Sequence, residues 1–543
     1  MRNVFLVLII SLITINLEAQ HFNEEQKIVA SDRFLTSFFG NDIAISGDYA
    51  IIGEFGDGLD STGTNAFASA GAAYIFKKDA NGDWNEVKKL IANDRTDGAN
   101  LGFSVHIDGD YAIVGARSDS EGLTGQATIN QAGSAYIFKK DAGGTDNWGL
   151  VKKLVASDRS VQGYFGNSVH LKDDYAIVGA RLEQDDAAGQ NPINAAGSAY
   201  IFKKDEGGTD NWGEVKKVVA SDRGNIANFG YRVFITTDYA VITAPFEEKD
   251  ISGQTPVLEA GAVYVLEKNA GGTDNWGEVQ KIVASNRATS DWFGYSVDIF
   301  NDYMVIGAAR KNDVTNSFIK AGAAYLFQKD ANGTWNEIKI LEGSSADEED
   351  YFGESVAINE DYIAIGAIRE DDDMTIGGTY NDAGAVYIFK KNEGGVNNWG
   401  EFQKITNSDR DDFDYFGASV CFDGNNLMVG TTRERLDANG TNDQFSAGAA
   451  YVFELGFPNS TSPIINNFDL KIYPNPVQSN LNISSEEVFQ TAIIYNLIGQ
   501  PIRQFSIQNT QVEINVSDLS KGTYILQLIT KNGQSVTKQI IKQ

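Results

Sequence analysis

The fold is decided by residues 164–223, which contain four short segments: FGNSV (165–169), DYAIVGA (174–180), AGSAYIFKK (196–204) and WGEVKKVV (212–219). They are rich in Val, Ile, Tyr and Phe and bounded by Gly, Asp and Asn, which is typical of strands. The second segment is almost wholly apolar and predicts a strand covered on both faces. The fourth alternates between apolar and charged residues and predicts an outer strand. The stretch is therefore expected to form a four-stranded antiparallel meander.

Copies of this unit fill residues 20–455. Each begins with a Phe-Gly or Leu-Gly pair, and the pairs follow one another at steps of 59 to 64 residues. A fixed period in this range indicates a solenoid, a propeller or an array. We assign a structural role in the repeat to the seven glycines of these pairs: Gly40, Gly102, Gly166, Gly230, Gly294, Gly353 and Gly417.

The two ends of the array distinguish a ring from an open solenoid. The seventh unit stops at Phe453 without a fourth segment, and residues 25–33 match the missing piece. This arrangement favours a ring, because an N-terminal strand can complete the last unit and remove the exposed edges. The sequence thus predicts an all-β protein with a seven-bladed β-propeller closed by residues near 25–31.

Strand direction alternates within each unit, so the loops between segments two and three share one face with the connections between units. These are the longest loops, for example 117–131 and 181–195. The short turns lie on the opposite face. Long loops on a rigid scaffold commonly carry binding residues, and we expect a ligand on this long-loop face. Its candidate ligand residues are Arg117, Arg181, Asp371, Asp372 and Asp373.

The Phe-Gly pair that opens each unit and the Gly-Ala pair that ends segment two resemble the FG-GAP repeat of the integrin alpha-chain propeller. The chain departs from that pattern where Arg117 and Arg181 replace the final proline, and where Thr243 replaces a glycine. The Asp-rich calcium loop of the integrin form is absent between segments one and two. No cofactor is predicted; Ca²⁺ stays possible at the acidic loops 57–60 and 371–373, which we interpret first as solvated loops.

Residues 456–467 have the composition of a linker, and residues 468–543 contain seven short strand-like runs that predict a small Ig-like β-sandwich. This segment resembles the C-terminal sorting domain of the type IX secretion system of Bacteroidetes. The matching residues are Tyr473, Pro474, Asn475, Pro476, Gly499, Gly522 and Tyr524. The resemblance implies export through the outer membrane, removal of the domain, and release or anchoring at the cell surface.

Residues 1–19 have the features of a secretory signal peptide, with cleavage expected between Ala19 and Gln20. No other segment approaches the length of a membrane span. The formal net charge is −30, of which residues 468–543 contribute +1 and residues 20–467 contribute −31. This charge argues against nucleic acid as a partner. The expected partners are the type IX secretion machinery and an extracellular glycan or protein, and the protein is expected to be a monomer.

No catalytic constellation is recognisable. His106 and His170 occupy one repeat position that varies freely between units, which favours packing or a surface role over a metal site or a base. The single cysteine, Cys421, is interpreted as a small buried apolar residue. The recurrent Asp-Arg pair, as in Asp158-Arg159, is interpreted as a structural ion pair or turn cap, and the tryptophans of segment four as packing between blades.

Three functions stay open at this point. We prefer a secreted or surface-attached binding protein of the adhesion type that uses the long-loop face. The alternative is an extracellular carbohydrate-active enzyme with a carboxylate pair on that face, since a glycosidase requires only two carboxylates. The third is a purely structural surface protein.

Overall fold

The computed structural model describes residues 21–64, 66–124, 126–312, 319–345, 347–372, 380–456, 470–485, 489–495, 501–507, 509–517, 519–530 and 535–543. The predicted signal peptide and its cleavage pair, most of the predicted linker, Asp373 and Gly499 lie outside these residues. The chain divides into two compact units, of which one is Glu24–Glu454 and the other contains Leu455–Gln543 with the N-terminal end. None of the described residues forms a helix with the length and apolarity needed to cross a bilayer.

The larger unit consists of seven four-stranded antiparallel sheets, which we number as blades in chain order. The first three blades are β2 (Ile43–Ser46), β3 (Tyr49–Glu54), β4 (Ala72–Lys78) and β5 (Trp84–Leu90); β6 (Leu101–Asp108), β7 (Tyr111–Ala116), β8 (Ser134–Lys139) and β9 (Gly149–Leu154); and β10 (Phe165–Lys172), β11 (Tyr175–Ala180), β12 (Ser198–Lys203) and β13 (Gly213–Val218).

The next three blades are β14 (Val233–Ile235), β15 (Tyr239–Ala244), β16 (Ala262–Glu267) and β17 (Gly277–Ile282); β18 (Phe293–Phe300), β19 (Tyr303–Ala308), β20 (Ala323–Lys329) and β21 (Trp335–Leu341); and β22 (Phe352–Ile358), β23 (Tyr362–Ala367), β24 (Ala385–Lys391) and β25 (Trp399–Ile405). In each of these six sheets the strands follow one another in chain order.

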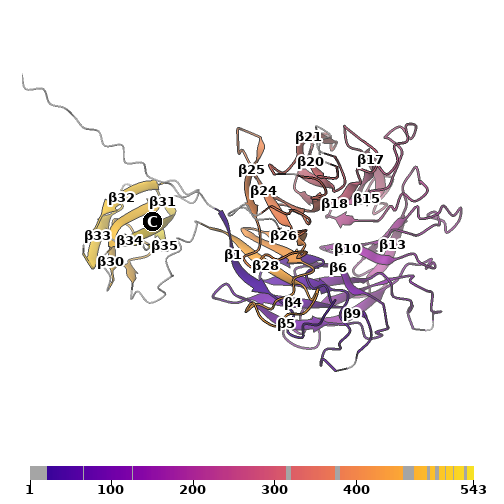
Figure 1. The fold of residues 1–543 in the computed structure, drawn as a ribbon, viewed down its shortest axis with the longest axis horizontal. Helices are drawn as coiled ribbons and strands as arrows, with labels where there is room; N and C mark the ends of the chain where they lie inside the picture. The colour runs from indigo at the N-terminus through magenta and orange to yellow at the C-terminus, as the bar shows by residue number, and fades with distance from the viewer. Residues whose placement is uncertain are drawn as a thin grey trace, which may run out of the picture. The chain divides into compact units, whose positions relative to one another are not determined.

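The seventh blade joins the two ends of the propeller. Its strand order is β1-β28-β27-β26, in which β26 (Phe416–Asp423), β27 (Asn426–Thr431) and β28 (Ala449–Gly456) come from the end and β1 (His21–Ile28) from the beginning. Figure 1 shows β1, in indigo, beside the orange β28. The predicted closure of the ring is confirmed, with a closing strand that begins a few residues earlier than expected.

The core of the propeller lies between neighbouring blades. The second and third strands of each blade are almost wholly buried, as the apolar runs predict; in β11 every residue is buried. The segment-four tryptophans are buried too, and four of them pack edge-on against the tyrosine that opens the second strand of the preceding blade. Trp148 and Tyr49 are one such pair, with ring centroids 5.5 Å apart. The tryptophans therefore serve blade packing, as interpreted from the sequence.

The seams between blades require glycine because two backbones approach closely there. Each Phe-Gly or Leu-Gly pair lies against the Ala-Gly pair of the preceding blade, for example Leu101 against Gly71 in a parallel bridge. At Gly102 the backbone has φ +83°, and a Cβ placed there would lie 1.9 Å from the carbonyl oxygen of Ala72. A side chain at this position needs both a left-handed backbone and a wider seam.

One seam differs from the others. At Gly294 a Cβ would meet the nearest backbone oxygen, that of Ala262, at 3.1 Å, and the Cβ of Thr243 at 3.2 Å. Thr243 is the residue that replaces the segment-two glycine in blade four. Because its side chain occupies part of the seam, the backbones of blades four and five lie further apart at this point.

The C-terminal unit has two sheets. The first has the order β29-β30-β33 and the second β32-β31-β34-β35. All seven predicted runs are strands: β29 (Lys471–Tyr473), β30 (Asn480–Ser484), β31 (Phe489–Tyr495), β32 (Pro501–Ser506), β33 (Gln511–Asn515), β34 (Gly522–Thr530) and β35 (Ser535–Lys542). Side chains of both sheets, among them Leu481 and Leu526, share one core, which confirms the sandwich.

The sorting motif is held to the last strand of this unit. Asn475 donates from Nδ2 to the carbonyl of Gln539 at 2.9 Å and accepts at Oδ1 from the backbone N–H of Ile541 at 2.8 Å. Tyr524 donates its hydroxyl to the carbonyl of Ser520 at 2.9 Å. Tyr473 is more than half exposed.

Removing the closing strand should open the propeller. Deletion of residues 20–31 removes β1 and leaves the edge of β28 unpaired. It also leaves buried Glu434 without Lys27, whose Nζ lies 3.3 Å from the Glu434 carboxylate and 2.6 Å from that of Asp409. We expect the melting temperature to fall by roughly 10 °C or more relative to a chain that begins at Gln20. Calorimetry of the two chains checks this, and an identical melt would contradict it.

The seam argument predicts that two glycines with positive φ respond differently to alanine. Gly102→Ala should lower the free energy of unfolding by more than about 2 kcal/mol, because the strain of a left-handed alanine and the clash of its Cβ with the backbone add together. Gly109→Ala should cost only about 1 kcal/mol, the strain alone. Gly109 is the matched control, since its φ is +56° and a Cβ there would meet nothing within 4 Å. Equal losses of stability in denaturant unfolding would show that the seam tolerates a side chain.

Candidate functional site

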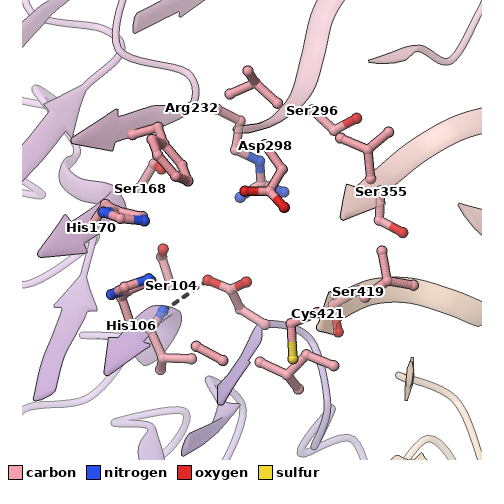
Figure 2. Close-up of a pocket in the computed structure, with 18 of the residues that line it drawn as sticks. Ser104, His106, Ser168, His170, Arg232, Ser296, Asp298, Ser355, Ser419 and Cys421 are labelled. Atoms are coloured by element: carbon pink, nitrogen blue, oxygen red, sulfur yellow. Dashed lines mark hydrogen bonds between the residues drawn. The ribbon is translucent and has the colours of Figure 1, made fainter. Parts of the chain in front are cut away.

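The first strand of each blade, from β2 to β26, lines a central channel of about 210 Å³. Figure 2 shows Ser104 and His106 of β6, Ser168 and His170 of β10, Asp298 of β18 and Cys421 of β26 around this space. The lining is polar for a channel built from strands, because serine, histidine and acidic side chains alternate with the apolar residues.

Side chains rather than a backbone ladder connect neighbouring first strands. Ser104 accepts the backbone N–H of Val169 at 3.1 Å, and Ser168 repeats the contact with Val233 at 3.1 Å. Asp298 accepts the N–H of Ile358 at 2.8 Å. These contacts satisfy buried backbone donors that face the channel, so much of the polar lining is structural.

The two histidines belong to the same system. His106 accepts the N–H of Leu171 at Nδ1, and His170 accepts that of Ile235 in the same way, at 3.5 and 3.4 Å. Their rings are in contact, with centroids 3.6 Å apart and planes tilted by 34°. An Nδ1 atom that accepts must be unprotonated, and burial lowers the pKa of His106 to about 4. The contacts are those of neutral packing residues.

Three carboxylates in the channel, those of Asp42, Asp298 and Glu354, are difficult to ionise because burial raises the pKa of each. Burial raises the pKa of Asp298 to about 7, against the effect of the hydrogen bonds from Ile358 and Ile299. Burial also raises the pKa of Glu354 to about 7, opposed by a hydrogen bond from Tyr295 and by the charge of Arg232. The side chains of Asp298 and Glu354 retain some contact with solvent in the channel.

Cys421 differs from its interpretation as a buried apolar residue. It is partly exposed and lines the channel, although it also packs against the apolar residues between the seventh and first blades. Burial raises the pKa of its thiol well above the ordinary value, so the thiolate is disfavoured.

On the long-loop face the channel opens into a mouth of about 280 Å³. Arg117 and Arg181, two of the candidate ligand residues, line this mouth together with Arg232. Glu354 is the one carboxylate among the residues described as lining it. The other lining residues are Asn41, Phe55, Phe103, Asn167, Tyr231, Tyr295, Ile368, Tyr415, Ala418 and Thr432.

Arg117 of the mouth and three arginines beside it, Arg310, Arg369 and Arg433, stack on aromatic rings. The guanidinium carbon of Arg117 lies 3.5 Å from the ring centroid of Phe103, and that of Arg433 lies 4.3 Å from Tyr415. Arg310 stacks on Trp292 at 3.7 Å, and Arg369 on Tyr351 at 4.7 Å. Trp292 in turn stacks on Tyr295 of the mouth, with centroids 5.7 Å apart. We call Arg117, Arg181, Arg310, Arg369 and Arg433, with these aromatic residues, the arginine ring.

Most of these guanidinium groups have no acceptor in the protein. The side chains of Arg117, Arg181, Arg310 and Arg433 make no hydrogen bond or ion pair with any residue that the structure describes, and the Nε atoms of Arg117 and Arg181 are buried without a partner. Only Arg369 has an ion pair, to Glu349 at 3.8 Å. Burial, followed by repulsion from Arg181, lowers the pKa of Arg117 to about 10. The ring therefore concentrates unpaired positive charge.

Many acidic residues are instead used within the blades. In the first blade Asp32 accepts the hydroxyl of buried Tyr74 at 2.7 Å and the Nζ of Lys89 at 2.6 Å. Lys89 also pairs at 2.6 Å with Asp57, whose side chain is 1% exposed. The pattern recurs in other blades, for example with Asp158, Tyr200 and Lys217.

The arginine of each Asp-Arg pair has a separate role. Arg159 donates to the carbonyls of Ala127 and Ser120 at 2.7 and 2.8 Å and thereby holds the long loop of the preceding blade. The two residues of the pair thus do not bond to each other: the aspartate pairs with a lysine and the arginine caps a loop. This refines the structural interpretation made from the sequence.

Of the two acidic loops, the carboxylates of 57–60 are buried and not solvated as we expected, whereas Asp371 is partly exposed and Asp372 is exposed. Asp57 is buried in its lysine pair, and Asp60 accepts the N–H and hydroxyl of Thr62 at 2.8 and 2.7 Å. Asp371 accepts the N–H of Asp382 at 2.6 Å, and the carbonyl of Asp372 accepts from Arg410 at 2.7 Å. Asp371 and Asp372 are absent from the described lining of the mouth, and the described residues contain no cluster of three or more metal-ligating side chains.

Sequence reasoning missed three members of the ring, Arg310, Arg369 and Arg433. They stand three residues after the segment-two glycine, whereas Arg117 and Arg181 stand two residues after it. Because of this one-residue difference, the two groups of arginines fall in different columns when the repeats are aligned. An arginine shortly after segment two in five of the seven units was the available signal.

Two family models match the chain. The model described as FG-GAP repeat matches residues 22–76, 84–138, 148–202, 212–266, 276–327, 335–389 and 399–453. Each match begins in or near the outer strand of one blade and ends in the third strand of the next, so the first match contains β1. The model described as secretion system C-terminal sorting domain matches residues 471–543. A comparison with curated proteins found no match.

The raised pKa of Asp298 predicts a pH-dependent stability. Its pKa is higher in the folded chain, about 7, than the ordinary 3.8, so its stabilising contribution is full below pH 4 and is lost as the pH rises to 7. The advantage of Asp298→Asn over the natural chain should therefore grow between pH 4 and 8, by at most about 4 kcal/mol and less with solvent in the channel. The hydrogen bond that Asp298→Asn loses changes the free energy of unfolding by the same amount at every pH. Melting curves at each pH measure this, and a constant difference would refute it.

Proposed function

Because the chain belongs to the FG-GAP repeat family, we propose that it is a binding protein of the adhesion type that takes an extracellular glycan or protein on its long-loop face. Its sorting domain indicates export by the type IX secretion system of Bacteroidetes to the cell surface or the extracellular space. Within this secreted β-propeller, the arginine ring at the channel mouth is the observation that carries the proposal. Hydrogen-bond donors that are held in place on one face without an acceptor lower the stability of the free protein, and a ligand that supplies the acceptors offsets this loss.

The distribution of exposed apolar side chains supports the same face. Exposed large apolar residues gather on the long loops and on the connections between blades: Phe34, Leu35, Phe67, Leu123, Val161, Ile226, Ile251, Leu258, Ile319, Phe413 and Phe445. Among the described residues of the turns on the opposite face, Val396 is the one large apolar residue exposed to this degree. Apolar groups that gather on one side of a soluble protein favour an interaction surface there.

An enzyme remains the second candidate, and Glu354 is the observation in its favour. A carboxyl group with a pKa near 7 at the mouth of a channel suits a general acid. The described lining of the mouth contains no second carboxylate to act as nucleophile or base. Asp42 and Asp298 line the channel below, where each accepts a backbone N–H. Glycan turnover that Glu354→Gln abolishes would establish the enzyme over the binding protein.

The proposal predicts that ligand binding depends on the long loops alone. The chain from Gln20 to Gln543 is immobilised and exposed to a panel of neutral and acidic polysaccharides and purified extracellular proteins. For any ligand found, the triple variant Leu258→Ser, Ile319→Ser and Phe445→Ser should weaken binding about tenfold or more.

Val396→Ser is the matched control, because it removes an exposed apolar side chain from the opposite face. Calorimetric melting of both variants verifies that they are folded. A ligand that tolerates the triple variant but loses affinity with Val396→Ser would contradict the proposed face, and a panel without any ligand would contradict the binding function.

A further inference from the structure

The arginine ring is positive within a strongly acidic protein. Of the described residues that line the mouth, Arg117, Arg181 and Arg232 are cationic and Glu354 is the sole acid, whereas the whole chain carries −30. Elsewhere in the propeller, acidic side chains are paired with lysines or cap loops. A positively charged site on a negatively charged protein favours an anionic ligand at that site.

The geometry of the ring leaves its hydrogen-bond donors available. A guanidinium that stacks on a ring keeps its plane fixed while its N–H groups point along the edge of that plane. Arg117 on Phe103 and Arg433 on Tyr415 are held in this way. A planar fork of donors matches a carboxylate, which accepts two parallel hydrogen bonds.

The surroundings of the ring favour a protein over a glycan as the bearer of the carboxylate. Sugars bind largely by stacking on exposed aromatic faces, but Phe103, Trp292 and Tyr415 each have one face covered by a guanidinium. The exposed residues on the same face include the aliphatic Ile226, Leu258 and Ile319, at 49, 54 and 53% exposure. Aliphatic side chains provide no stacking surface, whereas they suit a protein interface that has arginine and aromatic anchors.

We propose that the long-loop face docks a protein partner that places an acidic segment, with Asp or Glu carboxylates, at the channel mouth, where Arg117 and Arg181 bind it. This inference rests on the proposed binding function and names the chemistry of its ligand. The apolar residues of the long loops contact the partner around the acidic segment. An acidic polysaccharide is the rival ligand, and the test separates the two.

Two probes of similar charge are compared by fluorescence anisotropy: a fluorescein-labelled decaglutamate peptide with a leucine at each end, and a labelled polygalacturonate of ten units. The full chain from Gln20 to Gln543 should bind the peptide more tightly than the polyuronate. The double variant Arg117→Gln and Arg181→Gln should lose about tenfold in affinity for the peptide, and a rise from 50 to 200 mM NaCl should weaken binding further.

Arg435→Gln is the matched control, because Arg435 is an exposed arginine of the same face that already pairs with Asp443 at 2.8 Å. It should leave peptide binding unchanged. If the double variant does not fold, Arg433→Gln provides an independent test, because this arginine stacks on Tyr415 of the mouth and its loss should also weaken peptide binding. The melting temperature of each variant is measured in parallel, and the ring variants should melt no lower than the natural chain, since they relieve repulsion between like charges.

Preference for the polyuronate would overturn the assignment to a protein partner. Equal peptide binding by the double variant, or no binding of either probe, would overturn the anionic anchor itself. If the panel experiment finds a ligand that depends on the long loops, the proposed binding function stands even when the peptide experiment fails. Failure of the acidic-partner proposal can therefore be told apart from failure of the binding function.

Discussion

Pairing of β1 with β28 is the interaction on which the propeller depends. Without it the seventh sheet has three strands and an exposed edge, and the first and last blades are held together by the seam at Phe39 and Gly448 and by the apolar core between them. Lys27 of β1 adds a second connection, because it neutralises Asp409 and buried Glu434 of the closing blade. A closed ring of this kind holds the first strands of all blades at one distance from the axis. The channel and its mouth are therefore a consequence of closure.

The seams determine how charge is distributed over the molecule. Glycines let the backbones of adjacent blades approach, and in five of the blades the preceding connection brings an aspartate to a buried tyrosine and lysine, as Asp32 does for Tyr74 and Lys89. A buried charge is tolerated when it is paired and hydrogen-bonded. The arginine ring breaks this pattern, since its cations stack on aromatic rings and all but Arg369 lack an acceptor among the described residues. That contrast separates residues that stabilise the fold from residues that we assign to a ligand.

Much of the architecture was predictable because repetition makes local patterns reliable. The seven glycines at steps of 59 to 64 residues, the missing fourth segment after Phe453 and the seven runs of the C-terminal unit all correspond to observed elements. The acidic loop 57–60 was predicted wrongly, because its carboxylates are buried. Nothing in the residues around Asp57 indicates that Lys89, on another strand, lies within 2.6 Å of its carboxylate. The arginine ring was only half predicted, because Arg117 and Arg433 differ in offset along the chain and converge only when the blades close around one axis.

The sequence by itself determined the strand pattern, the number of blades, the closing strand and the secretion route, because these depend on periodicity and on short motifs that act locally or are read by other proteins. The tertiary structure alone decided which charges are neutralised and which stay unpaired. Coulombic and hydrogen-bond partners are set by distances of a few ångströms between residues such as Arg117 and Phe103, or Lys27 and Glu434, which come from different strands. Such distances follow from ring geometry, which no single repeat contains.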